Sequence, residues 1–180
     1  HYFRQNFSQV TNPPIDSLRE NKVMSLKTRF GNLGNILDFD NLTKENIYVL
    51  DSPILSNSEF KKFKSFFSNK IKIIDCTFKI DESLKQRLEE IRSESEISVR
   101  EGVNHLILSD QGISEEKAIV PMILAVGAIH SHLVKLGLRG YSSINVQTAE
   151  AMDTHSFAVL LGAGATTINP YLAIDSIYQR

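Results

Sequence analysis

The sequence predicts an α/β fold in which the strands of a parallel sheet alternate with helices. Short apolar runs suited to strands are separated by segments whose apolar residues recur at three- and four-residue spacing, and Gly or Pro stands at many boundaries. Such alternation builds parallel sheets with right-handed crossovers. About four to five strands can be counted from Lys70 onward, whereas a closed eight-stranded barrel takes about 250 residues. We therefore expect a rudimentary or incomplete TIM-barrel-like domain, or an open α/β sheet.

The N-terminal quarter of the chain carries the weakest periodicity. Residues 1–45 are expected to form an irregular segment, and residues 46–180 the β/α units of a single domain spanning 1–180. Ser56 and Glu59 have the spacing of a capping box, which predicts a short helix over about 59–67. Residues 70–78 alternate Lys and Ile before an apolar end, which predicts one strand.

The remaining elements follow one another closely. Asp81 or Ser83 can cap a helix over about 82–101, and Gly102 can end it. The apolar run 105–108 suits a fully buried parallel strand. Beyond it we expect a turn at 109–112, a helix from Pro121 to about 136, a strand over 143–148, a helix capped by Asp153 to about 161, a strand over 166–168 and a final helix after 169–171.

Composition narrows the possible partners and the compartment. The chain has 20 Lys and Arg against 21 Asp and Glu, so charge gives no reason to expect nucleic acid or an anionic membrane as a partner. No apolar run approaches the ~20 residues that span a bilayer. The single cysteine, Cys76, cannot form an internal disulfide or a multi-thiolate metal site. We expect a cytoplasmic protein and, because the sequence begins at His1, a piece of a longer one.

Polar residues stand where several predicted strands end, which is where sites lie in parallel α/β folds. They are Ser109–Asp110, Gln147–Thr148 and Asn169, and His155 follows near a helix start. Polar residues are also ordinary at any loop boundary. These residues motivate one alternative, a free-standing small β/α-barrel enzyme that binds a phosphate or flavin ligand.

The histidines and the cysteine are expected to be structural. His130 and His132 lie about 200° apart around a helix, so they cannot share a metal, and we expect one to be packed and the other exposed. His105 opens a buried strand, and Cys76 is expected to be a buried, inert thiol. No catalytic, cofactor-binding or metal-binding residue is assigned.

A rigid loop near the start has residue types suited to one particular geometry. Pro13 and Pro14 remove two backbone donors and fix two φ angles, and Asn12 is pushed out of the helical region. Thr11 and Asp16 flank the prolines with short polar side chains that can bond nearby backbone. Arg19 and Glu20 follow.

Several stretches of the chain, this loop among them, carry a resemblance: Phe7–Asp16 with Arg19–Glu20, Val23–Leu26, Leu50–Leu55, Leu106–Asp110, Ala125–His130, His155–Gly162 and Asn169–Ala173. Through them the chain resembles, over nearly its whole length, the central domain of the glutamate synthase large subunit. It departs from the family pattern at Gln111, at 147–149 and at Ser156, and these departures argue against a site role for the residues concerned.

The resemblance implies a parent enzyme that moves the amide nitrogen of glutamine to 2-oxoglutarate and makes glutamate reductively. In the family, an amidotransferase domain releases ammonia, and an FMN domain fed by an iron–sulfur cluster completes the reaction with electrons from a reductase subunit or ferredoxin. The central domain holds no cofactor itself, and the enzyme is cytoplasmic or, in photosynthetic eukaryotes, plastidic. The resemblance makes this chain a non-catalytic link that helps shape the ammonia path, with interdomain or ammonia-path candidates Thr11, Asn12, Pro13, Pro14, Asp16, Arg19, Glu20, His155 and Asn169.

Overall fold

The computed structural model describes residues 15–16, 18–31 and 47–179. The chain forms two compact units, His1–Asp51 and Ser52–Arg180. Among the described residues, no helix is both long enough and apolar enough to cross a membrane. That residues 1–180 form a single domain stays a prediction.

The first unit contains a short antiparallel pair, and one of its two strands lies in the stretch 1–45 expected to be irregular. α1 (Glu20–Val23) precedes β1 (Thr28–Phe30), which pairs with β2 (Tyr48–Leu50). Phe30 of β1 and Leu50 of β2 are buried. Each strand has three residues, too few for periodicity to reveal, and the pairing joins segments far apart in sequence.

The second unit is the α/β domain that the sequence predicts. A four-stranded parallel sheet has the order β3 (Ile71–Asp75), β5 (His105–Ser109), β7 (Ser143–Gln147) and β8 (Thr167–Asn169). Each strand lies beside the next along the chain, in unbroken register from Ile71 opposite His105 and His105 opposite Ser143. This sequential order without a reversal is that of barrel strands rather than of a doubly wound sheet. The described residues close no barrel, so the prediction of an incomplete barrel-like domain is confirmed.

The first residues of this unit extend the sheet beyond its last strand. Leu55 N donates to Ile168 O at 2.8 Å, and Ile168 N donates to Pro53 O at 2.8 Å, in a parallel bridge of Ile54 with Ile168. Residues 53–55 therefore lie at one edge of the sheet, beside β8. β3, which is the next sheet strand along the chain, lies at the other edge.

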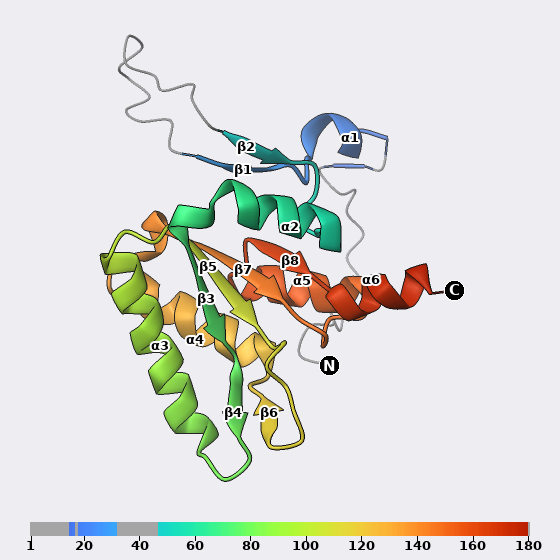
Figure 1. The fold of residues 1–180 in the computed structure, drawn as a ribbon. Helices are drawn as coiled ribbons and strands as arrows, with labels where there is room; N and C mark the ends of the chain where they lie inside the picture. The colour runs from blue at the N-terminus through green and yellow to red at the C-terminus, as the bar shows by residue number, and fades with distance from the viewer. Residues whose placement is uncertain (1–14, 17, 32–46, 180) are drawn as a thin grey trace, which may run out of the picture. The chain divides into compact units, whose positions relative to one another are not determined.

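One face of the sheet packs on helices. Ile74, Leu108, Val146 and their neighbours form a core with α3 (Leu84–Arg100), α4 (Met122–Lys135) and α5 (Thr154–Ala163). Figure 1 shows these three helices beside the sheet. Apolar residues at three- and four-residue spacing place Ile91 and Val99 of α3 in this core.

The other face is mostly polar. Because side chains alternate along a strand, each sheet strand places every second residue on this face. Its N-terminal end is covered by α2 (Asn57–Phe66), whose Phe63 ring centroid lies 5.5 Å from that of His105. On β5, β7 and β8 these residues are all buried: His105, Ile107, Ser109, Ser143, Asn145, Gln147, Thr167 and Asn169.

The single strand predicted over 70–78 is wrong, because the chain changes partners at Cys76. Cys76 N donates to Ser109 O at 2.7 Å, and Cys76 O accepts from Val120 N at 2.8 Å. After this switch, β4 (Thr77–Lys79) pairs antiparallel with β6 (Lys117–Ile119), a strand the sequence did not reveal. Figure 1 shows the β4–β6 ribbon extending beyond the carboxyl end of β3.

Most predicted helix boundaries are confirmed by their caps. Ser56 Oγ accepts from Glu59 N at 3.2 Å while Glu59 Oε2 accepts from Ser56 N at 2.8 Å, which completes the capping box of α2. Asp153 Oδ1 accepts from Ser156 N at 2.7 Å at the start of α5. Ser83 occupies the N-cap of α3 without a side-chain cap bond. The other elements are η1 (Ser68–Lys70), η2 (Arg139–Tyr141) and α6 (Tyr171–Tyr178).

Candidate functional site

The carboxyl ends of β5, β7 and β8 bring together the polar residues that the sequence singled out. Ser109 lies opposite Gln147, and Gln147 lies opposite Asn169, on the polar face of the sheet. All three side chains are buried. This carboxyl edge of the sheet is therefore the candidate site for a ligand.

These side chains form a continuous chain of hydrogen bonds across the strands. Ser109 Oγ donates to Gln147 Oε1 at 3.3 Å, and Gln147 Nε2 donates to Asn169 Oδ1 at 3.4 Å. Asn169 Nδ2 reaches the carbonyl of Leu55 at 3.0 Å and Asn57 Oδ1 at 2.8 Å. The sequence placed Asn169 among the site candidates; the structure shows it joining β8 to the start of α2.

A second, more deeply buried polar group lies just beyond these strands. Asp110 is fully buried, and its Oδ2 accepts from Thr148 Oγ1 at 2.7 Å and from Ala149 N at 2.8 Å. Its Oδ1 accepts from Tyr171 Oη at 2.9 Å. Three donors thus satisfy the Asp110 carboxylate, as a buried carboxylate requires. Burial, with the bond to Asp110, raises the pKa of Tyr171 to about 12.

The loop after β7 also caps α4. Glu150 Oε2 accepts from Met122 N at 2.7 Å, and Glu150 N donates to Thr148 Oγ1 at 3.0 Å. A carboxylate at a helix N-terminus satisfies a free backbone donor and complements the helix dipole. Sequence reasoning missed Glu150, because it lies 28 residues from the helix that it caps.

The carboxyl end of β3, at Asp75, is polar too, but it is more exposed. Asp75 Oδ1 accepts from Thr77 Oγ1 at 2.8 Å, and Lys117 Nζ lies 3.8 Å from Asp75 Oδ2. Arg87 of α3 donates to the Asp75 carbonyl at 2.7 Å and so fixes the point where β3 gives way to β4. Cys76 is fully buried, as predicted, and burial raises the pKa of its thiol to about 12.

The histidines do not converge. His155 is exposed in the first turn of α5. His132 Nε2 lies 2.8 Å from Glu96 Oε2 of α3, while His130 Nδ1 accepts from Arg139 Nε at 3.2 Å. The expectation that one of this pair is packed and the other exposed is wrong, because each is partly buried against its own partner. Within the described residues, no three His, Cys, Asp or Glu gather as metal ligands would.

The rigid Pro-Pro loop lies mainly outside the described residues, since Thr11, Asn12, Pro13 and Pro14 are among those not described. Asp16 is described. Its Oδ1 accepts from Leu18 N at 3.0 Å and from Arg19 N at 2.9 Å, which turns the chain into α1. The expected bonding of Asp16 to nearby backbone is thus confirmed. Glu20 and the side chain of Arg19 are exposed.

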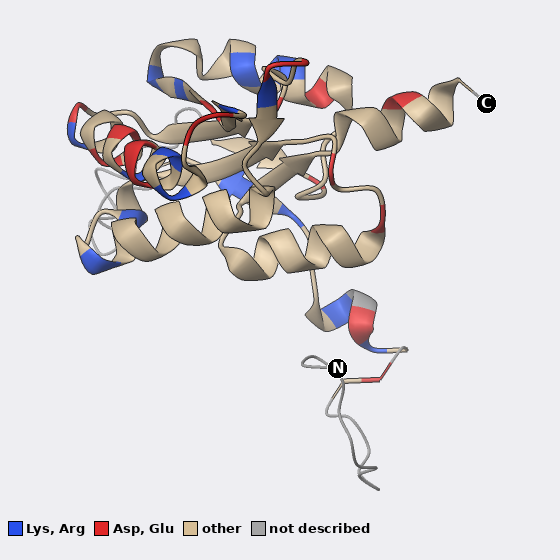
Figure 2. Cartoon of the chain, turned by 90° about the horizontal axis from the view of Figure 1, so that it is seen from below, with Lys and Arg blue, Asp and Glu red and all other residues tan. Residues whose placement is uncertain are grey.

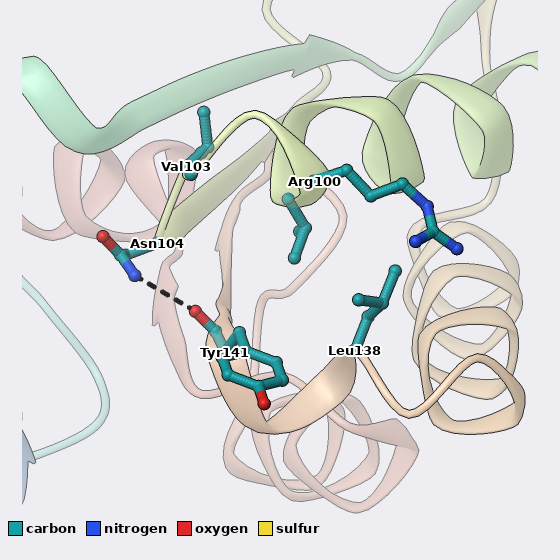
Figure 3. Close-up of a pocket in the computed structure, with 7 residues that line it drawn as sticks. Arg100, Val103, Asn104, Leu138 and Tyr141 are labelled. Atoms are coloured by element: carbon teal, nitrogen blue, oxygen red, sulfur yellow. Dashed lines mark hydrogen bonds between the residues drawn. The ribbon is translucent and has the colours of Figure 1, made fainter.

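A shallow pocket of about 480 Å³ lies at the other end of the sheet. Figure 3 shows it between the end of α3 and η2, with Asn104 Nδ2 donating to the Tyr141 carbonyl at 3.3 Å. Val103 and Asn104 precede β5, so the pocket lies at the amino ends of the strands. In barrel-like folds that end maintains stability and the carboxyl end holds sites. Its lining is Val99, Arg100, Gly102, Val103, Asn104, Leu138 and Tyr141.

Sequentially ordered parallel strands, helices on one face and a polar opposite face define the second unit as an incomplete barrel-like α/β domain. The chain belongs to the glutamate synthase central domain family, whose model matches residues 1–180.

Its relatives are much longer proteins. The NADPH glutamate synthase large chain of Azospirillum brasilense is 53% identical over 183 residues, which cover 100% of this chain and 12% of that protein. The large chain of Bacillus subtilis is 40% identical over 180 residues, again 100% of this chain and 12% of the relative. The chloroplastic ferredoxin-dependent glutamate synthase of Spinacia oleracea is 40% identical over 184 residues, covering 99% and 11%. The chain therefore spans about an eighth of the relatives that it matches.

Proposed function

We propose that this chain is the central-domain part of a glutamate synthase large chain and takes no direct part in the chemistry. The parent enzyme would convert glutamine, 2-oxoglutarate, two electrons and two protons into two molecules of glutamate. The observation that carries the proposal is the family match over residues 1–180 together with relatives that are named glutamate synthases.

The cofactors and the partners would belong to other parts of the parent enzyme. An amidotransferase domain and an FMN domain of the same chain would flank this one, and an iron–sulfur cluster would feed the FMN. Relatives named for NADPH and for ferredoxin support a reductase subunit or ferredoxin as the electron donor. The enzyme would work in the cytoplasm, or in a plastid as the spinach relative's name states for that protein.

The carboxyl edge of the sheet supports a structural role for this domain. Ser109, Gln147 and Asn169 bond to one another, and Asp110 is satisfied by Thr148 and Tyr171. These polar groups suggested the alternative of a free-standing enzyme with a phosphate or flavin ligand. Because they already satisfy one another, they give that alternative no support.

The Pro-Pro loop would hold position between the two active sites and wall part of the ammonia path. Its Thr11, Asn12, Pro13 and Pro14 supply stiffness, while Asp16 fixes the turn that follows. Arg19, Glu20 and His155 expose polar groups that can meet a neighbouring domain. Asn169 is buried, so its role would be to hold β8 against the start of α2.

Measuring both half-reactions in the full-length enzyme tests this role. Asp16→Ala removes the acceptor for Leu18 N and Arg19 N, whereas Asp16→Asn keeps an oxygen there and serves as the matched control. We expect Asp16→Ala and Pro13→Ala to leave glutamine hydrolysis largely intact, lower glutamate formation and release free ammonia, while Asp16→Asn stays coupled. Coupled activity in both variants would remove the loop from the ammonia path, and a wild-type full-length enzyme unable to make glutamate would overturn the proposal.

A further inference from the structure

We infer that the outer faces of α4 and α5 form a docking surface for another domain of the same longer polypeptide, an inference that rests on the proposed function. The surface, called here the α4–α5 face, comprises one stripe from each helix. Its residues are Ile123, Gly127 and Val134 of α4 and Thr154, Ala158 and Gly162 of α5.

Helical spacing places the two stripes side by side. One side of α4 carries residues at positions i, i+4, i+7 and i+11, which are Ile123, Gly127, His130 and Val134. The ring of His130 lies against Gly164 at the end of α5, so this side of α4 borders α5. On α5, three exposed residues four apart, Thr154, Ala158 and Gly162, form the outermost stripe.

The α4 part of the α4–α5 face exposes two large apolar side chains. Ile123 is 45% exposed and Val134 is 52% exposed, although both are large aliphatic residues. Thr154, Ala158 and Gly162 are small, so a partner helix can approach the α5 backbone closely. Exposed aliphatic side chains beside small residues offer a surface on which another protein can pack.

Charge distinguishes this face from the neighbouring helix. In α3, eight of 17 residues are Asp, Glu, Lys or Arg, as a solvated helix requires. In α4, one residue of 14 is charged, Lys135 at the end, and α5 has none in 10. Figure 2 shows α4 and α5 almost entirely tan beside the red and blue turns of α3. A helix without a polar charged face is normally covered by other protein.

The absence of charge also identifies the occupant. A surface without Lys or Arg rows attracts neither nucleic acid nor an anionic membrane, so an uncharged protein surface complements it. Relatives of this chain are about eight times longer, since its 183 aligned residues make up 12% of one of them. A tethered domain is present at an effective concentration in the millimolar range, which favours it over a second copy.

Cysteine accessibility in the full-length enzyme tests the assignment. Ala158→Cys reports on the α4–α5 face, and Thr154→Cys is a second reporter on the same stripe. Ser93→Cys on the exposed side of α3 is the matched control, because it lies on a helix of the same domain with a charged outer face. Labelling by a maleimide is followed by peptide mass spectrometry, in the native state and after denaturation.

We expect Cys at 158 and 154 to label at least about tenfold more slowly than Cys at 93 in the native enzyme, and all three equally after unfolding. Slow labelling should persist on dilution, and a crosslinker at 158 should reach a domain outside residues 1–180. Equal native rates, protection lost on dilution, or crosslinks to a second copy or to residues 1–51 would each overturn the assignment.

Activity separates this inference from the proposed function. If the enzyme makes glutamate from glutamine while Cys at 158 labels as fast as Cys at 93, the docking surface is wrong and the function stands. If Cys at 158 is protected in a protein that makes no glutamate, the proposed function is wrong.

Discussion

The imidazole of His130 occupies the space in which a side chain at Gly164 would begin. A Cβ atom built on Gly164 would lie 2.5 Å from His130 Nδ1, and Gly164 has a φ of 121°. Arg139 holds the ring in place, since its Nε donates to His130 Nδ1 at 3.2 Å and its Nη2 donates to the Gly164 carbonyl at 2.9 Å. Burial lowers the pKa of Arg139. The end of α5 therefore has room only for a glycine beside the His130 ring of α4.

Gly164→Ala should lower the free energy of unfolding by roughly 2 kcal/mol or more, because it combines a strained φ with a clash against a fixed ring. Urea denaturation of the chain measures this. Gly127→Ala is the matched control, since its added Cβ meets nothing within 4 Å. That control should be neutral or stabilising by up to about 1 kcal/mol. Equal stability of the two variants would contradict the close approach.

Tyr171 should make stability fall at alkaline pH. Its pKa is raised to about 12, chiefly by burial and then by Asp110, against an ordinary value of 10.0. The folded protein therefore keeps the phenol proton that the unfolded chain loses, and this stabilisation is present below pH 10 and lost between about pH 10 and 12. Tyr171→Phe should flatten this part of the pH–stability curve relative to wild type, and an unchanged slope would contradict the assignment.

His105 should have the opposite dependence at acidic pH. Burial, then the charge of Lys70, lowers the pKa of His105 from 6.5 to about 4, and Phe67 lies against the ring with centroids 4.0 Å apart. Between these two pH values, His105 binds a proton in the unfolded chain but not in the folded protein. The free energy of unfolding therefore decreases as pH falls from about 6.5 to 4.

The test for His105 is the pH dependence of unfolding by denaturant. His105→Asn keeps a polar partner for Ser143 Oγ, which lies 2.8 Å from His105 Nδ1, while it removes the titrating ring. We expect a shallower decline in stability over this range. Identical profiles for the wild type and His105→Asn would show that His105 is not the group.

Glu150 should stabilise α4 from outside the helix. Glu150→Ala leaves Met122 N without its acceptor and should cost about 1–2 kcal/mol, the usual penalty for a lost cap. Glu150→Gln keeps an oxygen acceptor but removes the charge, and should cost about 0.5 kcal/mol. Thermal unfolding of both variants checks the order. If Gln destabilises as much as Ala, charge rather than the hydrogen bond is the main contribution.

Local patterns predicted the regular part of the fold. The periodicity of Leu84, Ile91 and Val99 predicted α3, and the continuous apolar run before Ser109 predicted β5, because both depend only on neighbours in sequence. The change of partner at Cys76 and the strand β6 depend on hydrogen bonds to remote backbone, which no local pattern encodes.

The candidate site, too, could be predicted only in part from local patterns. The prediction that Ser109, Gln147 and Asn169 lie at strand ends placed them at one edge, since parallel strands align their carboxyl ends. That they would bond to each other, and that Asn57 would complete the chain of bonds, required the position of α2. The roles of the Pro-Pro loop residues stay predictions.

The position of residues 53–55 beyond β8 has a consequence for the order of assembly. The backbone of Leu55 pairs with Ile168, and Asn169 Nδ2 bonds the Leu55 carbonyl across 114 positions of sequence. During synthesis at about 5–20 residues per second, the opening residues of this unit wait several seconds for their neighbour to leave the ribosome. Until then residues 53–55 have no strand to pair with, so any truncation before β8 leaves the start of this unit without its partner in the sheet.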